Sequence, residues 1–334
     1  MSIASEITRL QGAKADLKTA IEAKGVTVGD ITIDGYAAKV AEIPTGGVTP
    51  PETPTDALLF YATDEFTIYD NLGSKTWDGT IYYSTDHENW AVWDGVARLT
   101  SVKTNNWHKV YLRGSGNRYT VNSDYSKGTL GFIGHGINCV GNCNNLLDYT
   151  TTPTLSQYAF MNLFRGVGNV YFDVTLPATT LSNYCYSNMF QGCASLTTAP
   201  ALPATTLTSS CYSNMFNGCA SLTTPPALPA TTLATYCYTN MFNGCASLTT
   251  APALPATTLT SNCYKSMFSS CSGIRLSTTQ TGEYQTEYRI PTSGEGTDAT
   301  GALNSMFSAT GGTFKGTPVI NTTYYTSNTV IPAT

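Results

Sequence analysis

The chain has 334 residues, which is enough for two or three domains. Only 12% of the residues are charged, and 17 Lys and Arg against 22 Asp and Glu give a net charge of -5. This balance argues against a nucleic-acid-binding protein, because counterion release requires a basic surface. No apolar run reaches the roughly 18 to 20 residues of a membrane span, and the first residues lack the apolar core of a secretory signal. We therefore expect that the protein does not insert into a membrane. We also expect that it is made without a secretory leader.

Residues 1–47 are predicted to form a helical segment for attachment and oligomerisation. The apolar residues of its first helix follow the alternating 4-3 spacing of a short coiled coil. An amphipathic helix that packs on its own chain is the alternative. The following segment offers little to cover the apolar face, so identical partner subunits are favoured. The expected contact residues are Ile3, Ile7, Leu10, Leu17 and Ile21.

Residues 7–43 read ITRLQGAKADLKTAIEAKGVTVGDITIDGYAAKVAEI. This segment resembles the N-terminal attachment segment of many bacteriophage tail-fibre and other virion appendage proteins. The resemblance implies docking on other virion structural proteins, formation of a homotrimer, and a location on the virion after assembly in the host cytoplasm.

A linker and a β module follow. Residues 48–56 are predicted to be a linker, because the stretch PTGGVTPPETP (44–54) is rich in Pro and Gly. Residues 57–138 contain short alternating segments separated by Asp-Gly and Gly-Ser turns, which predict an antiparallel β-sandwich. All four Trp of the chain lie in this module, and aromatic side chains on a β face can stack on sugars. Core packing is the favoured alternative. The candidate ligand-binding aromatics are Trp77, Tyr83, Trp90 and Trp93.

Residues 139–334 are dominated by a 26-residue repeat, seen most clearly in LPATTL at Leu176, Leu202, Leu228 and Leu254. Within a copy, the i, i+4 spacing of Cys and Met predicts a helical piece, followed by a short strand and a proline-bounded corner. The prediction is an α/β, leucine-rich-repeat-like solenoid with degenerate caps and an insertion near residues 279–295. The expected core residues are Cys185, Met189, Cys193, Leu196, Cys211, Met215, Cys219, Leu222, Cys237, Met241, Cys245 and Leu248.

The pattern CYSNMFQGCASLTTAPALPATTL resembles the BspA-type leucine-rich repeats of treponemal and Bacteroides-type surface proteins. The resemblance covers about Leu146 to Leu276. It implies a curved solenoid used for adhesion or binding, without enzymatic chemistry. The exposed surface of these turns is expected to bind a ligand through neutral side chains, with Thr205, Tyr212, Asn214 and Asn217 as candidates.

All 10 Cys lie at or beyond Cys139. A disulfide or metal framework is one interpretation. Cys185 and Cys193 are too far apart along a helix for a bridge, however, and a ladder of equivalent cysteines would have to break its symmetry to pair. Buried free thiols are therefore favoured. His135, Cys139 and Cys143 recur every four residues, but a fourth metal ligand is not evident, so no metal or cofactor is expected.

Catalytic motifs are not evident, and the carboxylates of the β module lie in turn-like contexts. Together with the two resemblances, this predicts a non-enzymatic bacteriophage fibre or appendage protein. It would attach to the particle through its N-terminus and bind a host-surface glycan or protein through its sandwich and solenoid. An architectural head or tail component without receptor binding, and a bacterial surface adhesin, are the alternatives.

Overall fold

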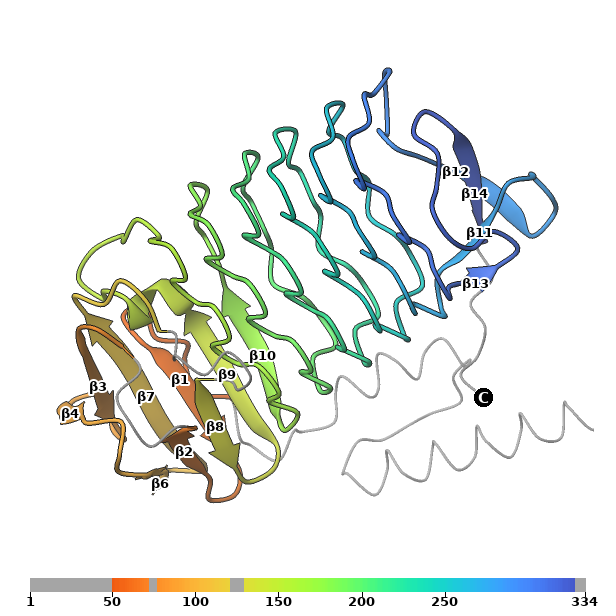
Figure 1. The fold of residues 1–334 in the computed structure, drawn as a ribbon. Coiled ribbons are helices and arrows are strands. Elements are labelled where there is room, and N and C mark those ends of the chain that lie inside the picture. The colour runs from red at the N-terminus through yellow and green to blue at the C-terminus, as the bar shows by residue number, and fades with distance from the viewer. Residues whose placement is uncertain (1–49, 72–76, 121–128, 328–334) are drawn as a thin grey trace, which may run out of the picture. The chain divides into compact units, whose positions relative to one another are not determined.

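The structure, a computed structural model, describes residues 50–71, 77–120 and 129–327. The chain divides into two compact units, Met1–Glu52 and Thr53–Thr334. The coiled coil expected in residues 1–47 lies outside the described residues. The second unit contains two β-sheets, a stack of repeated turns and a third small sheet, in this order along the chain (Figure 1).

The two sheets at the beginning of the unit share one apolar core. The larger has seven strands in the order β10-β9-β1-β7-β3-β4, with β6 also paired to β7, and the smaller has the order β5-β2-β8. The strands are β1 (Leu58–Ala62), β2 (Thr67–Asp70), β3 (Thr80–Ser84), β4 (Ala91–Trp93), β5 (Leu99–Thr100), β6 (Val102–Thr104), β7 (Trp107–Ser115), β8 (Leu130–Ile133), β9 (Ile137–Asn142) and β10 (Val170–Thr175).

Strand β1 is buried on both faces because two different clusters cover it. Leu58 and Phe60 lie in the main core, whereas Leu59 and Tyr61 lie in a second cluster on the outer face of the sheet. Tyr61 and Trp107 pack edge to face there, with ring centroids 5.0 Å apart. This explains why the segment LLFYA reads as a continuous apolar run.

The larger sheet continues directly into the repeats. Strand β9 pairs antiparallel with β1 on one side and parallel with β10 on the other, where Val170 lies opposite Ile137. The pairing is parallel because β10 lies one solenoid turn beyond β9, and successive turns run in the same direction. A 3₁₀-helix, η1 (Cys143–Leu146), lies between the two strands in the chain.

The expected α/β architecture is wrong: the described residues contain no α-helix, and the segment expected to be helical in each copy is a series of overlapping β-turns. Its backbone N–H groups alternate between two kinds of partner. The N–H of Met189 bonds the carbonyl of Tyr186 within its own turn, whereas the N–H of Phe190 bonds the carbonyl of Met215 in the next turn. An α-helix would keep every such bond within the segment, so the bonds between turns exclude it.

A ladder of overlapping β-turns explains the i, i+4 spacing of the apolar residues as well as a helix does. Apolar side chains enter the core in adjacent pairs every four residues, as in Cys185-Tyr186 and Met189-Phe190. Every fourth residue has a positive φ, with values of 58° at Tyr184, 55° at Asn188 and 75° at Gly192. Positive φ is required at the third residue of a type II turn and is tolerated best by Gly and Asn. The Asn and Gly of the first three full copies therefore favour the turn, and Ser266 and Ser270 take the same positions in the fourth.

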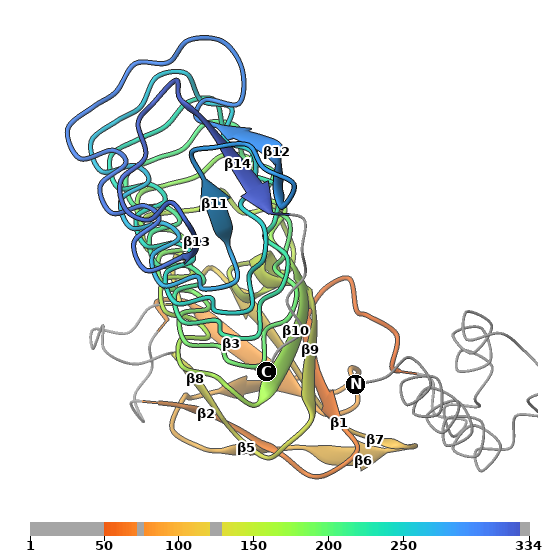
Figure 2. The ribbon, with the colours of Figure 1, turned by 90° about the vertical axis from the view of Figure 1, so that its right-hand side faces the viewer.

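Equivalent side chains form columns through the stack, which Figure 2 views from its end. The rings of Tyr186, Tyr212, Tyr238 and Tyr264 stack with centroids 5.7 to 5.8 Å apart. A parallel column of Phe rings continues to Phe307. Stacked aromatic pairs contribute about 0.5 to 1.5 kcal/mol each beyond the burial of their area, so the columns stabilise contacts between turns that no single turn could make.

A four-stranded sheet in the order β12-β14-β11-β13 ends the stack (Figure 1). Its strands are β11 (Arg275–Ser277), β12 (Tyr284–Arg289), β13 (Gly311–Gly312) and β14 (Thr323–Ser327). Phe307 packs on the last Phe of the column, and Tyr288 packs edge to face on Phe307. The sheet thus caps the end of the Phe column, which would otherwise need a further turn to bury it.

Candidate functional site

The insertion that interrupts the repeat is visible in the hydrogen bonds between turns. The N–H of Tyr212 bonds the carbonyl of Cys237 at the equivalent place of the next turn. The N–H of Tyr264, two turns after Tyr212, bonds the carbonyl of Ala302, which lies beyond the whole inserted stretch. The turn that begins at Tyr264 is therefore longer than a regular turn by about half the length of the repeat. Strand β12 lies within the added segment.

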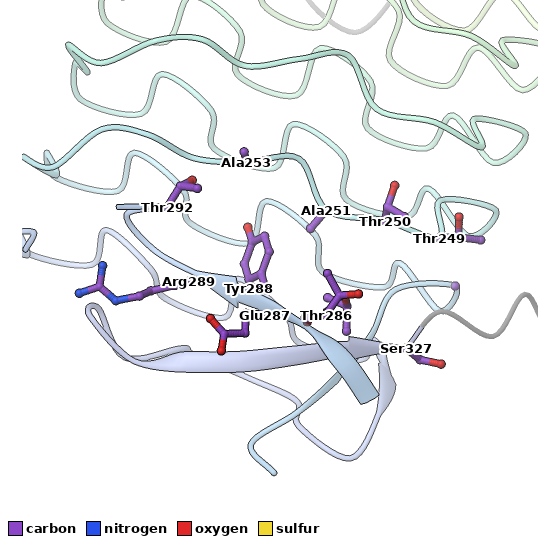
Figure 3. A pocket seen from close by; sticks show the side chains of 12 residues that line it. Thr249, Thr250, Ala251, Ala253, Thr286, Glu287, Tyr288, Arg289, Thr292 and Ser327 are labelled. Carbon is purple, nitrogen blue, oxygen red and sulfur yellow. The ribbon is translucent and has the colours of Figure 1, made fainter. Parts of the chain in front are cut away.

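A groove lies between this segment and the last regular turn, with a volume of about 430 Å³. One wall carries Thr249 to Ala251, Ala253 and Gly273, and the other carries side chains of β12 and β14, with Thr292 beside them. Figure 3 shows Arg289 and Thr292 toward one end, Thr249 and Ser327 toward the other, and Tyr288 between them. The volume is within the range of small-molecule sites.

The groove is lined mainly by hydroxyl and methyl groups. Hydroxyls come from Thr and Ser side chains of both walls, and methyl groups come from Ala251 and Ala253. Glu287 supplies an exposed carboxylate. Such a surface can donate and accept hydrogen bonds and can also pack against C–H groups.

Arg289 holds the loop that follows β12. Its Nη1 donates to the carbonyls of Pro291 and Gly294, and its Nη2 lies 3.0 Å from a carboxylate oxygen of Glu295. Asn321 supports the same loop, because its side chain bonds both the N–H and the carbonyl of Gly296, at 2.8 and 2.9 Å. The hydrogen bonds of the Arg289 guanidinium therefore hold the loop at one end of the groove in place.

Tyr288 forms part of the groove floor. Its ring is 8% exposed, and its hydroxyl donates to the carbonyl of Pro252 at 3.5 Å. Burial raises the pKa of Tyr288, so the hydroxyl is neutral at physiological pH. Thr292 ties the loop to the same turn, since its N–H bonds the carbonyl of Leu254 at 3.0 Å.

The four aromatic candidates of the β module are not brought together. Trp77 and Trp93 are 5% and 2% exposed, pack on each other with centroids 5.0 Å apart and belong to the main core. Tyr83 is partly buried against the same core. Trp90 lies on the outer face, where the guanidinium carbon of Arg113 is 3.7 Å from its ring centroid. A shared glycan platform of these four residues is therefore not formed.

The four ligand-binding candidates on the solenoid also do not form one surface. Tyr212 is 1% exposed and lies in the stacked Tyr column, so its assignment to a ligand-binding surface is wrong. Asn214 has a φ of 55°, and its Nδ2 donates to the Ser213 hydroxyl at 3.1 Å. Asn217 is half-buried, and its carbonyl accepts the N–H of Gly192. Thr205 is exposed, but its carbonyl accepts bonds from the next turn.

The expected oligomerisation residues, Ile3, Ile7, Leu10, Leu17 and Ile21, lie outside the described residues. The expected repeat-core residues are all buried, and they are Cys185, Met189, Cys193, Leu196, Cys211, Met215, Cys219, Leu222, Cys237, Met241, Cys245 and Leu248.

All ten cysteines are buried and carry free thiols. Burial raises the pKa of Cys245 to about 12 and that of Cys263 to about 11. Cys139 and Cys143 face the core, whereas His135 is exposed. Within the described ranges, no cluster of three or more His, Cys, Asp or Glu is arranged to hold a metal ion. A helix long and apolar enough to cross a membrane is likewise absent from this part of the chain.

A scan against protein-family models, a search of curated proteins and a search of solved structures each give no match to this chain. The groove residues were not among the sequence candidates. Two signals in the sequence point to them: the interruption of the 26-residue period, and the return of charged residues at Lys265 after a charge-free stretch from Val174 to Tyr264.

Proposed function

We propose that this chain is a non-enzymatic binding protein that holds a neutral host-surface glycan in the groove between the last regular turn and β12. The observation that carries the proposal is the lining of this groove. Thr and Ser hydroxyls on both walls match the hydroxyls of a sugar, and the methyl groups of Ala251 and Ala253 match its C–H faces. The carboxylate of Glu287 can accept two adjacent sugar hydroxyls.

The position of the groove also supports binding. Successive regular turns present nearly the same side chains, whereas Glu287, Tyr288 and Arg289 occur where the repeat is interrupted. The insertion gives this place a shape and a set of side chains that the regular turns lack. The loop is held by Arg289 and Asn321, so the groove is formed before any ligand arrives.

We propose further that the protein is a homotrimeric appendage of a bacteriophage virion, attached through its N-terminal segment. The support for this part is the resemblance of residues 7–43 to virion attachment segments. Immunogold labelling of phage particles with an antibody against the chain would test it. Labelling confined to bacterial cells would instead favour an adhesin.

Glycan binding can be tested with the full chain on an array of neutral and acidic bacterial glycans. The wild type is expected to bind neutral glycans, and Thr250→Trp, which fills the groove, is expected to lose this binding. Ala220→Trp is the control, because Ala220 is exposed on the solenoid outside the groove and is not a candidate ligand contact. Equal binding by wild type and Thr250→Trp, or no bound neutral glycan, would contradict the proposal.

A further inference from the structure

A second cavity adjoins the groove and extends it along the solenoid. It has a volume of about 570 Å³ and lies over two successive turns, lined by residues 224–229 and by residues of the stretch 250–255. The two cavities share Thr250, Ala251, Ala253 and Thr292. Together they follow the proline-bearing side of the solenoid away from β12.

Equivalent residues repeat along this second cavity. Thr224 and Thr250 are exposed and occupy the same place in successive turns, as do Ala227 and Ala253. Thr198 occupies the same position one turn earlier and forms a parallel β-bridge with Thr224. The surface therefore offers one hydroxyl and one methyl group for each turn, in a row parallel to the axis of the stack.

The spacing of the row selects the ligand. Bridged strands lie about 4.8 Å apart, and the stacked rings of the core have centroids 5.6 to 5.8 Å apart. An extended peptide presents side chains on one face only every 6.6 Å or so, since it rises about 3.3 Å per residue. A chain of equatorially linked pyranoses advances by about one layer spacing per sugar, so it stays in register with the row over several turns.

We infer that the ligand is an extended, neutral linear polysaccharide that runs from the groove along this row with about one sugar for each turn. This inference rests on the proposed function and names its ligand class. The hydroxyls of Thr224 and Thr250 would bond successive sugars. Ala227, Ala253 and the adjoining prolines would pack against the ring faces.

Cello-oligosaccharides of two to six sugars are suitable probes, because their β-1,4 linkages keep the chain extended. Titration of the full chain by isothermal calorimetry is expected to show at least a tenfold gain in affinity from the dimer to the hexamer. Malto-oligosaccharides of the same lengths are the control. They contain the same sugar, but their α-1,4 linkages coil the chain out of register, so their affinity is expected to depend little on length.

The substitution Ala227→Tyr tests the row itself, since Ala227 lines the second cavity and not the first. We expect the cellohexaose affinity of this variant to fall to that of cellobiose. Ala220→Tyr, an exposed position outside both cavities, should bind as the wild type does. Matching circular dichroism spectra and melting curves would show that both variants fold.

Failures of the two proposals are distinguishable. No bound neutral glycan on the array would overturn the proposed function. Array binding with no gain between cellobiose and cellohexaose, with an equal gain for the maltose series, or with no effect of Ala227→Tyr would overturn the inference alone.

Discussion

The Sγ of Cys219 donates a hydrogen bond to the main-chain carbonyl oxygen of Phe190, at 3.1 Å, across the boundary between two turns. The same bond recurs from Cys193 to Phe164, Cys245 to Phe216 and Cys271 to Phe242. A thiol is a small buried group that can also act as a weak donor, so it suits a position where two turns meet. The second Cys of each copy therefore links neighbouring turns without a covalent bond.

The buried thiols predict a loss of stability at alkaline pH. In the folded protein, burial raises the pKa of Cys211 and Cys245 to about 12. Unfolded thiols ionise near pH 8.5, so between pH 8.5 and 10 the unfolded state releases protons that the folded state keeps. The free energy of unfolding should fall by up to about 1.4 kcal/mol per pH unit for each such thiol. The urea midpoint, measured under reducing conditions, should decrease steadily across this range.

Alkylation provides the control for this prediction. Iodoacetamide should leave the thiols of the native protein unmodified at pH 8, and it should label all ten after unfolding without a reductant. Thiols that label only after reduction would mean that the cysteines are paired. A urea midpoint that is constant or rises between pH 8.5 and 10 would show that the thiols do not control stability.

The predictable part of the fold was its repetition. The 26-residue period and the buried columns follow from the sequence, because a repeated pattern of Cys, Met, Phe and Leu can be buried only by stacking. The conformation of each turn did not follow. A spacing of four over eight residues fits a helix and a ladder of β-turns alike, and only the positive φ of Asn188 and Gly192 separates them.

The candidate site was missed for a related reason. Polarity alone places Tyr212 and Asn214 on the surface, but Tyr212 lies in a stacked column and Asn214 has a left-handed backbone conformation. The groove depends on the pairing of β12 with β14 and on a loop closed between Arg289 and Asn321. These contacts join residues that are distant in the chain, so the interrupted period locates the insertion but not the groove that it forms.

Asn214 is predicted to stabilise its turn through its backbone conformation. Its φ of 55° costs a residue with a Cβ roughly 1 to 2 kcal/mol unless a short polar side chain supports it. Asn214→Ala should therefore lower the free energy of unfolding by about 1 kcal/mol, whereas Asn214→Gly should change it by a few tenths. Urea unfolding followed by tyrosine fluorescence measures both. Neither variant should lose binding in the glycan array, and a selective loss would restore Asn214 as a ligand contact.

Arg289 is predicted to keep the loop 290–296 closed. Removal of its guanidinium in Arg289→Ala leaves the carbonyls of Pro291 and Gly294 without this donor, so the loop should open. Chymotrypsin cleavage near Tyr288 should accelerate severalfold, and glycan affinity should fall. Arg289→Lys should restore little of the protease resistance or the glycan affinity. An ammonium group cannot replace the planar guanidinium, which donates to several acceptors at once.

The matched control for Arg289 is Arg275, which also pairs with a glutamate, at 2.8 Å from Glu283, and is similarly exposed. Arg275→Ala should leave the cleavage rate near Tyr288 unchanged. Equal acceleration in both variants would mean that general destabilisation, rather than the bonds of Arg289 to its loop, controls access to the protease.

Tyr212 is predicted to stabilise the stack with its ring and not with its hydroxyl. The hydroxyl is buried and has no hydrogen-bond partner among the described residues, whereas the ring stacks on Tyr186 and Tyr238 at 5.7 and 5.8 Å. Desolvation of an unpaired hydroxyl costs about 1 to 3 kcal/mol, so Tyr212→Phe should leave the free energy of unfolding unchanged or raise it. Tyr212→Ala removes the ring and should lower it by about 3 to 5 kcal/mol, as large-to-small changes in a core do. Urea unfolding of both variants separates the two contributions. A loss of more than about 1 kcal/mol in Tyr212→Phe would show that the hydroxyl is bonded in solution, and that the column is polar at its centre.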